Sequence, residues 1–363
     1  MFGLLLIASS SVVSQPIALY TPATNVVNHS LIDLDVEVFA ERIEAGDYAG
    51  GLLVYETGGN SVSSSGSVRT LQGFTTAGDR MANHTRYPTY RNFWEDDDYA
   101  NTYVIDAISG VWADRSDPLR AELAIKGVQY QVMWMYMLHE FEDALILCEE
   151  GSIAVSDASD SAPHRWDEGW AFYAGSLEGT DGTGDGVLLH NLAEIRCVQF
   201  GTCTSTAGAI ANEEALLAAE TGLAHIIAGN CTAARAMYDD IFVAATIPIL
   251  QGTLKYVYDA DPVVNGGNCT GTACTYDEAW AEGWAFAAAI LPLINACDPS
   301  VATVVRANLD VDNDVPMPDG YVAVKAQIES TYACLGLTCA DVGAYQTISG
   351  VYPGMEACTD DAS

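Results

Sequence analysis

The chain has 363 residues, half of them hydrophobic, which is enough for a large core or for two lobes. Its 49 Asp and Glu against 14 Lys and Arg give a formal net charge of -35. This charge excludes a protein that binds nucleic acid or anionic lipid, and it favours cations as partners. An acidic surface is also a common adaptation to salty surroundings, so the charge alone identifies no ligand.

The chain begins with a segment typical of a secretory signal peptide. Residues 1–14 hold a short apolar run, Phe2–Ala8, followed by small residues that suit a cleavage site. Ten cysteines, an even number, predict a disulfide framework. Four Asn-x-Ser/Thr tripeptides predict glycosylation at Asn28, Asn83, Asn230 and Asn268. Together these features predict a secreted, periplasmic or cell-surface protein.

Most of the following chain carries a helical period, so the predicted fold is mainly α and disulfide-stabilised. The segment Leu31–Gly46 has apolar residues three and four apart and ends at a glycine. Near residues 51–58 we expect a short pair of strands. The apolar pattern over Asp117–Glu150 predicts one long, mostly buried helix or a bent pair of helices. Further helices are predicted over Asn212–Gly229, over Ala233–Asp261 with a kink at Pro248, and over Tyr276–Cys297, kinked or ended near Pro292.

The motif Glu-Gly-Trp-Ala-Phe occurs twice, beginning at Glu168 and at Glu282. One further segment lies upstream of each copy, and these two segments also match each other. They end at Ala144 and Ala260. The offsets are 114 and 116 residues, and two matches in the same order indicate an internal duplication. We therefore expect two duplicated helical units, a first helical half over residues 15–190 and a second over 191–363, forming one compact unit or two lobes.

The repeated motif carries acids at the head of an apolar run. A buried carboxylate is costly unless it is paired or binds a metal, so Asp167, Glu168, Asp277 and Glu282 are candidate metal ligands. Two alternatives remain open. Acids in the first turn of a helix suit its dipole, so all four residues are also candidate helix caps. Glu168 and Glu282, which repeat in register, are also candidates for a structural salt bridge.

Tyrosines lie beside both copies of the motif. Hard ferric iron favours carboxylate, phenolate and imidazole ligands, which adds Tyr173 and Tyr276 to the metal candidates. His139 lies on an apolar helix, where a single histidine is usually a core residue. Three further histidines show no partner spacing in the sequence: His164, His190 and His225.

Five segments in order resemble the algal low-iron-inducible periplasmic proteins, which are related to the phytotransferrins. They are "WDEGWAFYAGSLEG", "NLAEIRCVQFGTC", "IPILQGTLKYVYDAD", "AEGWAFAAAILPLI" and "CLGLTCADVG". The resemblance covers nearly the whole mature chain. It implies extracellular or periplasmic capture of Fe(III) for uptake, with (bi)carbonate as a synergistic anion in the phytotransferrin branch. Arg196 is the candidate partner of that anion.

The predicted function is therefore ferric-iron binding without catalysis, with a cell-surface uptake receptor as a further partner. The sequence has no Walker loop, nucleophile elbow or His-Glu-x-x-His motif. Ala279–Ala296 is apolar but contains Glu282 and Pro292, so we expect no transmembrane segment in the mature chain. One alternative is an acidic cell-surface protein linked to inorganic carbon supply, without a specific iron site. Another is a metal-dependent hydrolase on a helical scaffold.

Overall fold

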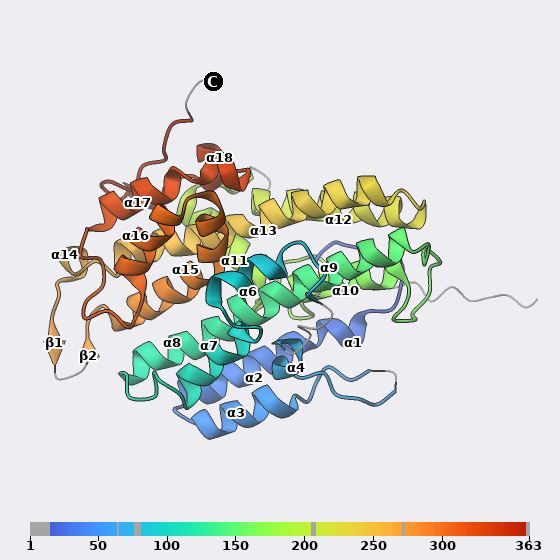
Figure 1. The fold of residues 1–363 in the computed structure, drawn as a ribbon, viewed down its shortest axis with the longest axis horizontal. Coiled ribbons are helices and arrows are strands. Elements are labelled where there is room, and N and C mark those ends of the chain that lie inside the picture. The colour runs from blue at the N-terminus through green and yellow to red at the C-terminus, as the bar shows by residue number, and fades with distance from the viewer. Residues whose placement is uncertain (1–14, 64, 76–80, 205–207, 271–272, 361–363) are drawn as a thin grey trace, which may run out of the picture.

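The computed structural model of the chain describes residues 15–63, 65–75, 81–204, 208–270 and 273–360. The predicted signal peptide, residues 1–14, lies outside the described residues. Figure 1 shows that helices make up nearly all of the regular structure. The prediction of a mainly α fold is therefore confirmed.

Helices follow one another along the whole described chain. The first are α1 (Val27–Ser30), α2 (Ile32–Glu44), α3 (Tyr48–Thr57), α4 (Leu71–Thr75), α6 (Tyr87–Trp94), α7 (Tyr99–Ile108), α8 (Asp117–Gly127), the π-helical segment η1 (Val128–Val132), α9 (Met133–Glu149) and α10 (Ala162–Ala174). Then come α11 (Leu189–Phe200), α12 (Ile210–Ile227), α13 (Cys231–Asp259), α14 (Pro262–Asn265), α15 (Asp277–Cys297), α16 (Pro299–Leu309), α17 (Tyr321–Glu329), α18 (Tyr332–Leu335) and α19 (Cys339–Val342). Two short antiparallel hairpins pair β1 (Cys269–Thr270) with β2 (Ala273–Cys274) and β3 (Gln346–Thr347) with β4 (Gly350–Val351).

The long helices lie where the sequence predicts them. The predicted helix over Asp117–Glu150 runs through α8, η1 and α9 without a break in the chain of helical residues. Within it, η1 changes the hydrogen-bond pattern for five residues. Helices α13 and α15 continue past Pro248 and Pro292, so neither proline ends its helix.

The expected strands near residues 51–58 are wrong, because this segment forms helix α3. The side chain of Asp47 caps the helix by accepting from the backbone nitrogen of Gly50 over 2.9 Å. Tyr55 is fully buried, and its ring lies 6.1 Å from the ring of Phe39 on α2. The cap and the packing against α2 outweigh the strand preference of the aromatic and β-branched residues.

Two helix pairs contain the repeated motif, α9 with α10 and α13 with α15. Figure 1 shows α9 and α10 side by side, with α12 beside them. In both copies the glycine of the motif lies at the contact: Gly169 faces the ring of Phe141, and Gly283 faces Tyr256. The glycines therefore permit a close approach of the paired helices. The two halves and their boundary at residue 190 stay a prediction.

Disulfides cross-link helices and the segments that follow them. One joins the end of α9 to the start of α13, and another lies within the segment that ends α11. The described bonds are Cys148–Cys231, Cys197–Cys203, Cys297–Cys334 and Cys339–Cys358. None of the cysteines in the described part of the chain is free. The prediction of a disulfide-stabilised fold is thereby confirmed.

Two helices are long and apolar enough to cross a membrane by length and composition alone. They are α13 and α15, and 83% and 78% of their most apolar windows are buried within the fold. Both therefore occupy the position of core helices, which pass the same test.

Replacing Gly169 by alanine tests the close contact between α9 and α10. The added methyl group would lie 2.7 Å from the ring of Phe141, so the ring or the paired helices must shift. We expect a loss of about 1–3 kcal/mol in the free energy of unfolding, measured by urea denaturation. Gly59→Ala is the control, because its methyl group would meet only Asp35 at 3.6 Å. Equal unfolding midpoints for the two variants would contradict this packing.

Candidate metal centre

Two donor side chains lie one turn apart on helix α10. His164 and Glu168 are both buried, and Nε2 of His164 is 3.0 Å from Oε1 of Glu168. The helix begins at Ala162, so Glu168 lies beyond its first turn. This position excludes the helix-capping alternative for Glu168 and for the adjacent Asp167.

A third donor comes from the short helix α1. Nε2 of His29 lies 2.8 Å from the same carboxylate oxygen, Oε1 of Glu168. The ligand atoms of His29, His164 and Glu168 all lie within 4.8 Å of one another. Two imidazoles and one carboxylate are a recurrent donor set for iron and for zinc, and they leave further coordination positions open.

Hydrogen bonds behind His164 decide which of its nitrogens faces the other donors. The hydroxyl of Thr24 donates to Oδ2 of Asp167 over 2.7 Å, and its oxygen is 2.8 Å from Nδ1 of His164. A hydroxyl has one proton, so Nδ1 of His164 must donate to Thr24. Nε2, on the other side of the ring, is therefore the nitrogen of His164 that faces Glu168.

Asp167 is the acceptor that fixes this arrangement. Its carboxylate also accepts from the hydroxyl of Tyr20 over 2.6 Å and from the backbone nitrogen of Thr24 over 2.8 Å. Burial raises the pKa of Asp167 to about 6, although the hydrogen bonds from Tyr20 and Thr24 oppose the rise. The carboxylate is thus mostly ionised at neutral pH. The predicted ligand Asp167 orients His164 from behind, as outer partners of metal-binding histidines do.

His29 also turns Nε2 toward Glu168. The guanidinium of Arg69 contacts the same nitrogen. Burial lowers the pKa of His29, which outweighs the opposing effect of Glu168, so the ring is uncharged at neutral pH. Among the described residues, the buried Nδ1 of His29 has no hydrogen-bond partner.

Three side chains that can bind a metal therefore face one another in a buried place. Burial raises the pKa of Glu168, but the imidazoles of His164 and His29 and the guanidinium of Arg165 outweigh it and hold the pKa well below its usual range. The carboxylate is ionised and the imidazole of His29 is uncharged, which is the state that metal ligands require. A metal ion that enters the group would take the place of the protons that the histidines share with Glu168.

Two arginines and a second carboxyl group surround the donors. Nη1 of Arg165 donates to Glu168 over 2.8 Å and to Glu140 over 2.7 Å. Burial and the neighbouring Glu168 raise the pKa of Glu140 well above its usual value, which favours the neutral acid. Nη1 of Arg69 is buried and has no hydrogen-bond partner among the residues that the structure describes. The surroundings therefore hold positive charge that can receive an anion.

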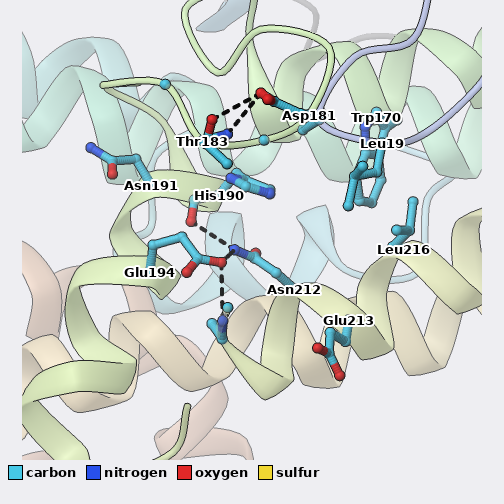
Figure 2. Close-up of a pocket in the computed structure, with 15 residues that line it drawn as sticks. Leu19, Trp170, Asp181, Thr183, His190, Asn191, Glu194, Asn212, Glu213 and Leu216 are labelled. Atoms are coloured by element: carbon cyan, nitrogen blue, oxygen red, sulfur yellow. Dashed lines mark hydrogen bonds between the residues drawn. The ribbon is translucent and has the colours of Figure 1, made fainter. Parts of the chain in front are cut away.

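The structure places Tyr173 on the opposite side of α10, nine positions after His164. Its hydroxyl donates to Oδ1 of Asn212 over 2.6 Å, and Nδ2 of Asn212 donates to Glu194 over 2.7 Å. Figure 2 shows Asn212, Glu194 and His190 lining a cavity of about 360 Å³. Tyr173 is thus part of the wall behind this cavity and is not brought to His164 and Glu168.

Tyr276 and Asp277, which precede the second copy of the motif, make structural contacts at the start of α15. Asp277 is the first residue of that helix, and it accepts from the backbone nitrogen of Cys274 over 2.9 Å and from Ser116 over 2.6 Å. The ring of Tyr276 packs 6.2 Å from that of Trp280. For Asp277 the capping alternative accounts for the position.

Glu282 has a lysine where Glu168 has two histidines. Its Oε1 lies 3.6 Å from Nζ of Lys126. Both residues line a cavity of about 260 Å³ together with Arg196, whose guanidinium lies over the rings of Tyr256 and Phe286. A carboxylate paired with a partly buried lysine is a poor cation ligand, so the equivalent acids differ in chemistry. Arg196 belongs to this second cavity and not to the surroundings of Glu168.

Sequence reasoning missed both histidines of the donor group. The expectation that His164 has no partner spacing is wrong, because Glu168 follows it by four positions, which is one helical turn. That spacing was the available signal. His29 precedes His164 by 135 residues, and only the fold brings the two together.

The four predicted glycosylation sites all carry exposed asparagine side chains, at Asn28, Asn83, Asn230 and Asn268. Their exposure is compatible with glycan attachment, which stays a prediction.

The chain was compared with protein families, curated proteins and solved structures. A family model described as low iron-inducible periplasmic protein matches residues 4–351, which is nearly the whole chain. No curated protein and no solved structure matches the chain.

Replacing Thr24 by valine tests the orientation of His164. The variant keeps the shape of the side chain but removes the hydroxyl between Asp167 and His164, so the ring is no longer held with Nε2 toward Glu168. We expect an affinity for Co(II) about 10–100-fold lower, measured from the visible absorption of the bound ion. Thr303→Val is the control, because this exposed threonine bonds only to Pro299 of its own helix. Unchanged affinity in Thr24→Val would contradict the assigned tautomer.

Proposed function

The chain belongs to the low iron-inducible periplasmic protein family, and from this premise we propose that it binds ferric iron outside the cell membrane and holds it for uptake. The observation that supports the proposal is the convergence of His29, His164 and Glu168 on one buried point. Delivery to a cell-surface uptake receptor is part of the proposal.

The donor types suit iron. Imidazole and carboxylate are both acceptable to ferric iron, and a set of two histidines and one carboxylate on one side of the ion leaves positions for other ligands. Thr24 and Asp167 hold His164 ready, so little reorganisation is needed when the ion enters. The strongly acidic surface, with its net charge of -35, raises the local concentration of cations.

The arginines favour an anion that binds together with the iron. A ferric ion next to the guanidinium groups of Arg69 and Arg165 would face strong repulsion, and Glu168 alone supplies one negative charge. A small anion bound to the ion and to an arginine offsets this repulsion. We propose (bi)carbonate as this anion, with Arg69 as its partner in place of the predicted Arg196.

The proposed role is binding without catalysis. Two histidines and one glutamate also hold zinc in hydrolases, so the metal-dependent hydrolase shares the donor set. A hydrolase needs a metal position that a substrate can reach, whereas the side chains of His29, His164 and Glu168 are only 8%, 5% and 4% exposed. An acidic protein linked to inorganic carbon supply would instead bind cations weakly, and added salt would remove that binding.

Matched variants of the two copies of the motif test the proposal. Glu168→Gln removes the charge of the proposed ligand and keeps its shape, so we expect ferric affinity to fall by more than about 100-fold. The measurement is competition with a chelator of known strength. Glu282→Gln is the control and should keep the wild-type affinity, because Glu282 pairs with Lys126. The proposal fails if the two variants bind iron equally well.

Omitting bicarbonate tests the anion. We expect the wild-type protein to bind ferric iron more weakly in carbonate-free buffer, and the affinity to recover when bicarbonate is added. Arg69→Gln should lose most of this recovery. Arg42→Gln is the control, since Arg42 is exposed and pairs with Asp47 over 3.3 Å. A bicarbonate effect of the same size in Arg69→Gln and wild type would rule out Arg69 as the partner.

A further inference from the structure

A second group of donors lies on helix α9. His139 and Asp143 are four positions apart, and Nε2 of His139 is 3.7 Å from Oδ2 of Asp143. Nε2 of His84, in the loop before α6, is 3.2 Å from Oδ1 of the same carboxylate. The three ligand atoms lie within 4.8 Å of one another. The geometry points to a second metal site, made of His84, His139 and Asp143, that takes a divalent first-row transition ion.

The second group is built like the first one. Each has a histidine and an acid one turn apart on a long buried helix, His164 with Glu168 on α10 and His139 with Asp143 on α9. Each receives its third donor from a remote Asn-His-Ser/Thr tripeptide, Asn28–Ser30 or Asn83–Thr85. The similarity of the two groups supports the second site, because in the first group hydrogen bonds through Thr24 orient His164 for metal binding.

The loop that carries His84 is held in place by Glu142. The carboxylate of Glu142 accepts from the backbone nitrogen of Thr85 over 3.0 Å and also from its hydroxyl. Its other side lies 3.6 Å from Nδ1 of His84. A carboxylate near Nδ1 favours the tautomer with its proton there, which leaves the lone pair of Nε2 facing Asp143. Glu142 is therefore a positioning residue and not a ligand.

The two histidine rings fit around one ion. The rings of His84 and His139 stack with centroids 4.9 Å apart and an angle of 23° between their planes. Both Nε2 atoms lie near the same carboxylate, that of Asp143. The side chains of His84 and His139 are 1% and 0% exposed, whereas that of Asp143 is 16% exposed and leaves a way to solvent.

The charge around this group differs from that around Glu168. Arg86, two residues from His84, pairs with Asp239 over 2.8 Å and lies over the ring of Phe242. Its charge is therefore directed away from the second group. Two imidazoles with one carboxylate ligand and Glu142 behind them match a divalent ion, without the anion that ferric iron needs beside Arg69. Histidine and carboxylate together favour zinc, iron(II) or cobalt(II) over calcium or magnesium.

The experiment counts Co(II) ions bound per chain in metal-free protein, at high salt so that the acidic surface contributes little. We expect the double variant His164→Gln, Glu168→Gln to bind one Co(II), because its His84, His139 and Asp143 are untouched. Adding His84→Gln should remove this ion. His225→Gln on α12, added instead of His84→Gln, is the control and should leave one ion bound.

Two results would overturn the second site. One is a double variant that binds no Co(II), which would leave His84, His139 and Asp143 as an internal ion pair. The other is a triple variant with His84→Gln that still binds one ion at the same affinity. Because His84 lies in a loop, circular dichroism is expected to show an unchanged helix content in the triple variant. Iron binding by wild type is measured separately, so a failed second site leaves the proposed function untouched.

Discussion

The buried carboxylate of Glu168 is the constraint around which the first half of the chain is arranged. An ionised carboxylate without partners would cost several kcal/mol in this position. One of its oxygens, Oε1, contacts His29 from α1 and His164 one turn earlier on α10. The other, Oε2, contacts Arg165. The glycine that follows, Gly169, lets α9 approach closely enough for Glu140 to share Arg165. Helix packing and charge pairing therefore depend on one another at this point.

The same network explains why the two copies of the motif have different roles. In the second copy Lys126 neutralises Glu282, so this acid is a structural ion pair. In the first copy two imidazoles adjoin Glu168, and the guanidinium of Arg165 that bonds to Glu168 is shared with Glu140. An incoming ion can replace the attraction of Arg165 while Glu140 retains the arginine. Binding would then change few contacts, which suits the proposed role of holding iron and releasing it for uptake.

Much of the fold can be predicted from the sequence, because apolar periodicity fixes α2, α9, α12, α13 and α15 within a few residues. The strand prediction fails for the segment that forms α3, because the helix cap at Asp47 and the contact with Phe39 leave no periodic pattern in the sequence. For the site, the repeat pointed to Glu168, and burial of an acid pointed to a cation. His29 could not be found, because no local spacing connects it to α10. The sequence predicts Asp167 and Glu282 as metal ligands along with Glu168, because it shows where an acid lies but not which residue the acid faces.

The most direct test of the account is a crystal structure of the iron-loaded protein with anomalous scattering recorded at the iron edge. The account predicts an iron peak bounded by Nε2 of His29, Nε2 of His164 and Oε1 of Glu168. A small anion should bridge the ion and Arg69. An iron peak beside Glu282, Asp277 or Tyr173, with none at Glu168, would contradict the central claim.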